Sequence, residues 1–212
     1  MTYSIIGILA TILLLITNRE LKFIEDHKEE ASVFFHTVLE MMRTRDKEDF
    51  LQKEDVIYAG QFALFFLAEW KDTTVFRMVG EILARLGEDD DRWLGDILTE
   101  NLPNILYQLY DGNAQLLAQF LYDTDLSPFA RVAYEMVAIQ LYLDQRLSLD
   151  DLLSMLRRFE TFSEDELDVD VISFLCDYMA RAHIPEYLPD IRKWINLGWV
   201  SPQRSEEHTS EL

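Results

Sequence analysis

VIYAGQFALFFLAEW, from Val56 to Trp70, is apolar on nearly every side when it is wound into a helix. Such a helix is stable only when other elements surround it, so it belongs in the middle of a helical layer. Lys71 and Asp72 then turn the chain, and Gly87 is suited to end a second helix. One face of that second helix is apolar at helical spacing, through Val75, Phe76, Val79, Ile82, Leu83 and Leu86. The pattern predicts an antiparallel helix pair.

The same pairing recurs further along the chain. Asp72, Asp111 and Asp144 each mark a turn between two apolar stripes, at intervals of 39 and 33 residues. These intervals are close to the roughly 40-residue helix pairs of HEAT and armadillo repeats. Ser127 and Pro128 form a strong helix start, because the hydroxyl caps the helix and proline suits its first position. We therefore predict an all-α fold, a HEAT-like α-solenoid of stacked antiparallel helix pairs.

The flanking segments extend this pattern in both directions. We expect one or two helices over Glu20–Ala31 and Ser32–Arg43, and a polar connector over TRDKEDFLQKED, residues 44–55. A last pair is expected over Ser163–Ala182 and Pro185–Leu197, the first of these opening with a capping box between Ser163 and Glu166. No low-complexity linker divides the chain, so residues 1–203 are predicted to form a single domain.

The two ends of the chain are unusual. Ile5 to Ile16 is an apolar run with helical spacing, but no Lys or Arg precedes it and it is shorter than the roughly 20 residues of a membrane span. We interpret it as a buried first helix, and a membrane or export segment is the alternative. Residues Arg204–Leu212, RSEEHTSEL, resemble a translated sequencing adaptor, so we expect a non-native tail and a missing natural C-terminus.

Composition narrows the classes of partner. The chain has 19 Lys and Arg against 39 Asp and Glu, a net charge of −20. Nucleic acids and anionic membrane surfaces repel such a protein, so neither is an expected partner. The acidity serves solubility or, alternatively, a basic partner. Cys176 is the single cysteine, which precludes an intramolecular disulfide and suits a reducing cytoplasm, the location we expect.

Three segments carry a family resemblance: GDILTENLPNILYQLYDGN (95–113), PFARVAYEMVAIQLYLDQRLS (128–148) and YLPDIRKWINLGWVSP (187–202). Their order resembles an uncharacterised bacterial family filed as a domain of unknown function, over roughly Lys22 to Pro202. The resemblance implies a HEAT-like helical fold. Longer members often end in a SEC-C motif, a Cys-rich zinc-binding tail, which would lie beyond Pro202. The family has no established catalytic residues to carry over.

Metal sites are not expected. His27, His36 and His183 are scattered and form no HExxH motif, and Cys176 and His183 are seven residues apart on one predicted helix face, too few ligands for zinc.

The acidic run of residues 88–91 does not fit a calcium loop, because Leu94 stands where the loop needs glycine. We expect these carboxylates to complement the dipole of a helix that holds Trp93 and Ile97.

Catalytic motifs are also missing from the sequence. Asp96, Glu100 and Asp111 could be imagined as an acid/base group, but spacing shows no pocket that would separate their pKa values, so a solvated surface is favoured. No GxSxG, GxxxxGK[ST] or GxGxxG occurs. We therefore expect neither an enzyme nor a cofactor.

Second helices of stacked pairs commonly line a binding face. Arginine and polar residues gather on the expected second helices although the protein is acidic, namely Arg77, Glu81, Arg85, Gln115, Gln119, Ser154, Arg157 and Arg158. Several of these arginines stand near helix C-termini, where cations offset the dipole, so a purely structural role is the alternative.

The sequence thus predicts a non-enzymatic protein-interaction module that binds an acidic or extended peptide of another protein on this face. An accessory part of a larger protein, with its metal-binding or catalytic segment in the missing C-terminus, is the second hypothesis. A membrane-attached module is the third.

Overall fold

The computed structural model describes residues 18–162 and 168–200, and the regular secondary structure of these residues is entirely helical, without a strand. The all-α prediction is confirmed for this part of the chain. The α-helices are α2 (Asn18–Asp26), α3 (Lys28–Thr44), α4 (Lys47–Leu51), α5 (Glu54–Glu69), α6 (Phe76–Leu86), α7 (Asp90–Leu94), α8 (Ile97–Glu100), α9 (Leu102–Leu109), α10 (Ala114–Leu121), α11 (Pro128–Leu143), α12 (Leu149–Leu156), α13 (Val169–Arg181) and α14 (Leu188–Asn196). Short 3-10 turns are η1 (Thr73–Val75), η2 (Gly87–Asp89), η3 (Arg157–Thr161) and η4 (Pro185–Tyr187).

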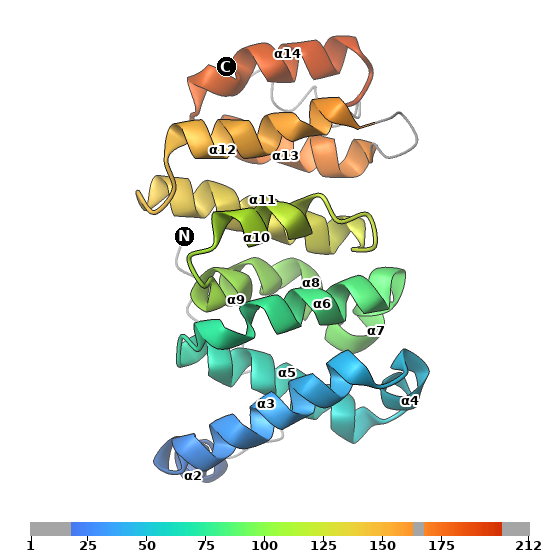
Figure 1. Cartoon of the computed structure of the whole chain (residues 1–212), viewed down its shortest axis with the longest axis vertical. Helices are drawn as coiled ribbons and strands as arrows, with labels where there is room; N and C mark the ends of the chain where they lie inside the picture. The colour runs from blue at the N-terminus through green and yellow to red at the C-terminus, as the bar shows by residue number, and fades with distance from the viewer. Residues whose placement is uncertain (1–17, 163–167, 201–212) are drawn as a thin grey trace.

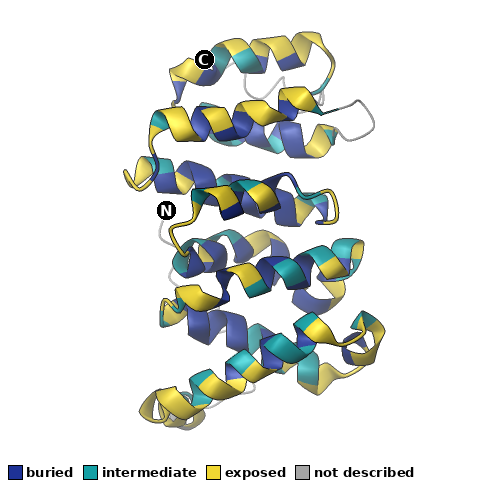
Figure 2. Ribbon diagram, viewed as in Figure 1, coloured by how far each residue is buried: buried dark blue, intermediate teal, exposed yellow. Residues whose placement is uncertain are grey.

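The helices form two layers (Figure 1). In the rear layer α5, α9, α11 and α13 pack on one another in that order. The front layer holds α3, α6, α10, α12 and α14, and the chain alternates between the layers from α5 onward (Figure 1). The rear helices are largely buried where they meet the front layer, whose outward sides are exposed (Figure 2). One continuous hydrophobic core therefore runs between the layers.

Helix α5 is the apolar helix that the sequence places in the middle of a layer. Its residues from Ala63 to Ala68 are all buried. Gly60, in the same helix, lets its neighbours approach closely: a Cβ there would lie 2.6 Å from Met42 Sδ and 2.8 Å from Trp93 Nε1. The prediction for α5 is confirmed, because a helix without a polar face has to be covered on all sides.

The predicted turns are also confirmed. Helices α5, α9 and α11 end at Glu69, Leu109 and Leu143, within three residues of the acidic turn residues. Lys71 and Gln145 follow α5 and α11 with left-handed backbone, at φ 56° and 60°. In each case the next amide donates back to a carbonyl in the last helical turn, Asp72 N to Leu67 O and Arg146 N to Leu141 O, as in a Schellman motif.

The prediction of a polar connector over residues 44–55 is wrong, because this segment contains the helix α4. Asp46 caps this helix by accepting a hydrogen bond from the Glu48 amide. Phe50 and Leu51 are buried, so the two apolar residues inside a polar stretch anchor the segment to the core.

Further predictions about helix boundaries are wrong. The break between the first two described helices falls at His27, so Ala31 and Ser32 lie together inside α3. Helix α13 begins at Val169 with Asp168 as its cap, and the capping box over residues 163–166 lies outside the described residues. Trp93 and Ile97 belong to separate helices, α7 and α8, because the chain turns at a glycine with φ 52°. His183 lies beyond the end of α13 at φ 53°, so it shares no helix face with Cys176.

The predictions for both chain ends, residues 5–16 and 204–212, fall outside the described part of the structure. Among the described helices, none combines the length and the apolar character that crossing a membrane requires.

Candidate functional site

The predicted polar face lies entirely in the front layer. Arg77, Glu81 and Arg85 are on α6, and Gln115 and Gln119 are on α10. Ser154 is on α12, and η3 carries Arg157 and Arg158. All are exposed except Glu81, which is partly buried. The elements that carry these residues follow one another up the front of the molecule (Figure 1).

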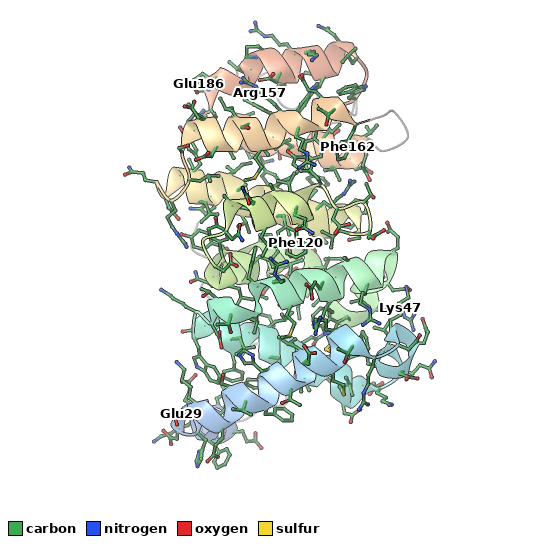
Figure 3. The ribbon with its side chains drawn as sticks, viewed as in Figure 1. Glu29, Lys47, Phe120, Arg157, Phe162 and Glu186 are labelled. Carbon is green, nitrogen blue, oxygen red and sulfur yellow. The ribbon has the colours of Figure 1, made fainter. Side chains whose placement is uncertain are left out.

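Most charged groups on this face are engaged within the protein. Arg85 donates from Nη2 to the Arg45 carbonyl oxygen at 2.6 Å, at the end of α3. Arg157 pairs with Asp190 of α14 at 2.9 Å and also donates to the Glu186 carbonyl oxygen. Figure 3 labels Arg157 and Glu186. These guanidinium groups therefore join neighbouring helices, which supports the structural alternative for both.

Some of the remaining residues of the face are also engaged within the protein, and others are free. The Arg158 guanidinium lies 4.9 Å from the centre of the Tyr122 ring, and Glu81 pairs with Arg43 of α3 at 3.2 Å. Arg77, Gln115 and Gln119 make no ion pair or side-chain hydrogen bond with the described residues. The charged and amide side chains that stay free on the predicted face therefore lie on α6 and α10, and the exposed Ser154 of α12 also makes no side-chain hydrogen bond with the described residues.

The rear layer presents a different surface, an apolar groove between α8, α9, α11 and α13. It encloses about 80 Å³ and is lined by Leu98, Thr99, Pro103, Phe129, Val132, Ala133, Met136, Phe174 and Tyr178. We call this set the rear groove. Phe129 is 48 % exposed, which is unusual for so large an apolar side chain on a strongly acidic protein.

The outer face of α11 explains why the groove is uncharged. The two charged residues of this helix, Arg131 and Glu135, both point inward and are buried. Its outward positions are occupied by Phe129, Gln140 and Leu143, which are exposed, and by the partly buried Met136. A surface helix normally places its charges toward solvent, and α11 does the reverse.

Aromatic rings extend the groove from α11 to α13. The ring centres of Phe129 and Phe174 are 6.5 Å apart, and those of Phe174 and Tyr178 are 6.3 Å apart. Asp96 and Glu100 stand exposed beside the Thr99 side of the groove. With Asp111, these two carboxylates were the imagined acid/base group; all three are exposed to solvent, as the favoured interpretation expects.

Behind the groove, α11 carries a buried polar centre that sequence reasoning missed. Glu135 is wholly buried, and its two carboxyl oxygens have no hydrogen-bond partner among the described residues. Arg131, one turn earlier, pairs instead with Asp168 through Nη2 and Oδ2 at 3.2 Å. Burial raises the pKa of Glu135 well above its usual value, Arg131 opposes the shift and Asp168 adds to it. Burial therefore favours the neutral form of the Glu135 carboxyl.

The thiol and phenol near this centre are equally unreactive. The pKa of Cys176 is raised to about 12, mainly by burial and in smaller part by the nearby Glu135 and Asp177. Burial likewise raises the pKa of Tyr187, whose hydroxyl has no hydrogen-bond partner among the described residues. A thiol that stays protonated is a poor nucleophile, so this centre serves packing better than chemistry.

Asp90, in the acidic run, is buried and bonded to another helix, a role that the helix-dipole interpretation does not include. Its side chain is 2 % exposed and accepts a hydrogen bond from Ser127 Oγ at 2.5 Å. Ser127 Oγ in turn accepts from the Ala130 amide and so caps α11 as predicted. Burial raises the pKa of Asp90 to about 6, against the hydrogen bond from Ser127, which lowers it.

The histidines have local roles in the described structure. His36 Nε2 lies 2.8 Å from Asp72 Oδ2, and His27 Nδ1 lies 2.8 Å from the Phe23 carbonyl oxygen. No group of three or more His, Cys, Asp or Glu side chains converges in a metal-binding arrangement within the described ranges.

Two helical layers with a common core and an apolar groove on one outer face define an all-helical protein, without a catalytic cluster among its described side chains. The chain belongs to the family described as "Protein of unknown function (DUF1186)", whose model matches residues 16–180. The family resemblance seen in the sequence is therefore confirmed. No curated protein matches the chain. No solved structure matches it either.

Two pockets of the described structure differ in how far the family match covers them. A larger one, of about 220 Å³, lies between α13 and α14 and is lined by Met179, Ala180, His183, Ile184, Pro185, Leu188 and Ile191. Most of its lining falls after residue 180, outside the family match. The rear groove, from Leu98 to Tyr178, lies wholly within the match, which makes it the better candidate for a site that serves the family's function.

Proposed function

We propose that the protein is a non-enzymatic interaction module that acts in the cytoplasm, built as a HEAT-like α-solenoid. The alternation of the chain between two layers supports the repeat interpretation, with α5–α6, α9–α10, α11–α12 and α13–α14 as successive pairs. The recurrence of the same left-handed turn after α5, α11 and α13 supports it as well. Stacked helix pairs commonly bind partners along an extended face.

The observation that carries the proposal is the uncharged outer face of α11. Helix α11 buries both of its charged residues and leaves Phe129 exposed, in a chain of net charge −20. Exposed aromatic and methionine side chains in a polar surround are typical of protein-binding sites, because their burial supplies most of the binding free energy. The rear groove is therefore the proposed site for a protein partner.

Site-specific photo-crosslinking in cells tests this function. The photoreactive residue p-benzoylphenylalanine replaces Phe129 in the rear groove and, in a separate variant, Gln119 on the front layer. Both positions are exposed, so they report on opposite layers with equal access to solvent. We expect a defined protein adduct from position 129 and none from position 119. Absence of adducts from both positions would contradict the proposal.

The front face remains a second candidate because Arg77 of α6 is exposed and unpaired among the described residues, and Gln115 and Gln119 of α10 are exposed in the same layer. An acidic or extended peptide would be its partner, held by the guanidinium group. An adduct from position 119 alone would assign binding to this face.

Direct binding tests the front face independently. Arg77→Glu should abolish binding of an aspartate-rich peptide in fluorescence anisotropy, whereas Lys53→Glu, at an exposed position outside this face, should leave it unchanged. Arg85 and Arg157 are unsuitable for this test, because their substitution would also break contacts between helices.

A further inference from the structure

Acidic side chains lie on both long sides of the rear groove. Asp96 and Glu100 flank Thr99 along α8, and Asp170 lies one helical turn before Phe174 on α13. All three carboxylates are exposed and form no ion pair with the described residues. Arg181, further along α13, is paired with Asp177 at 2.8 Å, so it does not offset them.

The floor of the groove suits a helix of another chain. Phe129, Val132 and Met136 are spaced three and four residues apart along α11, so they form a ridge of about 10 Å, or two helical turns. A partner helix with apolar residues at the same spacing can pack against such a ridge. Met136 adds a flexible side chain that adapts to different apolar shapes.

We propose that the rear groove binds a basic amphipathic helix, whose apolar stripe packs on Phe129, Met136 and Phe174 and whose Lys and Arg side chains face Asp96, Glu100 and Asp170. This inference rests on the proposed function and adds the chemistry of the partner. The net charge of −20 favours the same partner, because it attracts a cationic segment from a distance and repels an acidic one.

Three synthetic peptides of equal length test the charge and the shape. One is an 18-residue peptide of Leu and Lys with leucine at i, i+3, i+4 and i+7; the second replaces each Lys with Gln, and the third has the Leu–Lys composition in scrambled order. Fluorescence anisotropy with the full chain measures each dissociation constant. We expect the patterned Leu–Lys peptide to bind at least tenfold more tightly than either of the others.

Matched variants locate the binding site. Phe129→Ser should weaken binding of the Leu–Lys peptide about tenfold, whereas Tyr58→Ser should not, although both side chains are 48 % exposed. Glu100→Gln and Asp170→Asn together should weaken binding several-fold and leave the Leu–Gln peptide unaffected. Glu54→Gln, an equal kind of charge change at an exposed position of α5, is the control for general attraction. Circular dichroism melts check that each variant is folded.

The outcomes separate this inference from the proposed function. Equal binding of the Leu–Gln and Leu–Lys peptides, both lost in Phe129→Ser, would keep a protein-binding groove and overturn the basic partner. Binding that ignores Phe129→Ser but falls in Glu54→Gln would reduce the effect to general charge attraction and overturn the inference. A dimer seen by analytical ultracentrifugation and abolished by Phe129→Ser would assign the groove to a second copy of the chain and overturn it as well.

Discussion

Asp90 illustrates how a residue from an acidic surface run comes to be buried. Its carboxyl lies under the start of α11 and accepts a hydrogen bond from Ser127, so it links α7 to the start of α11. Because its pKa in the folded protein, about 6, is above the ordinary value of 3.8, protonation favours the folded state. The stabilisation is complete below pH 4 and is lost as the pH rises through 6.

Asp90→Asn removes this pH dependence while keeping an oxygen for Ser127. We expect the variant to exceed the wild type in free energy of unfolding by about 1–3 kcal/mol at pH 7.5, since each pKa unit corresponds to about 1.4 kcal/mol. The difference should vanish near pH 4. Urea titrations at both pH values measure it. Asp91→Asn, at the exposed neighbouring position, should change little at either pH. A less stable Asp90→Asn protein at pH 7.5 would show that the charged form is the favoured one.

Gly80 is the residue that lets two front-layer helices approach. A Cβ at this position of α6 would overlap the ring of Phe120, which projects from α10 (Figure 3). We therefore expect Gly80→Ala to lower the free energy of unfolding by about 1–3 kcal/mol, although alanine is the better helix former. Thermal and urea unfolding measure the loss.

A double-mutant cycle with Phe120→Ala isolates this contact. Phe120→Ala alone should cost about 3–5 kcal/mol, because it empties a buried site. In that background Gly80→Ala should cost nothing further, since the ring that it would overlap is gone. Equal costs of Gly80→Ala in both backgrounds would refute steric contact as the cause.

At the scale of the element, helix ends are set by local chemistry. Ser127 and Ser148 cap α11 and α12 by accepting hydrogen bonds from the Ala130 and Asp151 amides, and for Ser127 this is the position that the sequence indicates. Left-handed turns follow the rear helices, and non-glycine residues occupy most of them, so each carries a conformational cost of about 1 kcal/mol.

Gln145→Gly should relieve this cost. Glycine adopts φ 60° without steric strain, so we expect a gain of about 0.5–1 kcal/mol in the free energy of unfolding despite the greater freedom of the unfolded chain. Gln119→Gly, inside α10, should instead lose about 1 kcal/mol. Urea denaturation of the two variants gives the comparison, and a destabilised Gln145→Gly protein would mean that the glutamine side chain has an interaction worth more than the strain.

At the scale of the whole molecule, like charges repel one another across the surface. The net charge of −20 on 212 residues opposes the compact state, and salt weakens this repulsion as the Debye length falls from about 30 Å at 10 mM to about 8 Å at 150 mM. The Tm should therefore rise between these salt concentrations, equally in NaCl and choline chloride. Differential scanning calorimetry provides the measurement. A falling Tm would show that the surface ion pairs outweigh the repulsion.

Much of the helical structure can be predicted from the sequence, because helix formation depends on residues that are close together in the chain. The apolar stripes predict α5, α6, α10 and α11, and the acidic turn residues mark where the rear helices end. The short helix α4 was missed because its two buried residues stand among polar ones and its capping residue, Asp46, is one of many aspartates. The start of α13 was misplaced for a similar reason, since two capping residues compete within a few positions.

The candidate sites depend on which helix faces meet. Arginines chosen from the sequence prove to be divided between contacts within the protein, as for Arg157, and open exposure, as for Arg77. The rear groove was missed, although one signal for it exists in the sequence: α11 has only two charged residues, spaced one turn apart on the same face.

Local sequence alone therefore determined that this protein is helical, where most of its helices end and which family it resembles, because hydrophobic period and capping act over a few residues. Tertiary structure alone decided that Arg131 and Glu135 turn inward, that Asp90 is buried under α11, and that Phe129 remains open beside Phe174. The reason is that burial is a property of two surfaces in contact, and the second surface is contributed by residues far away in the chain.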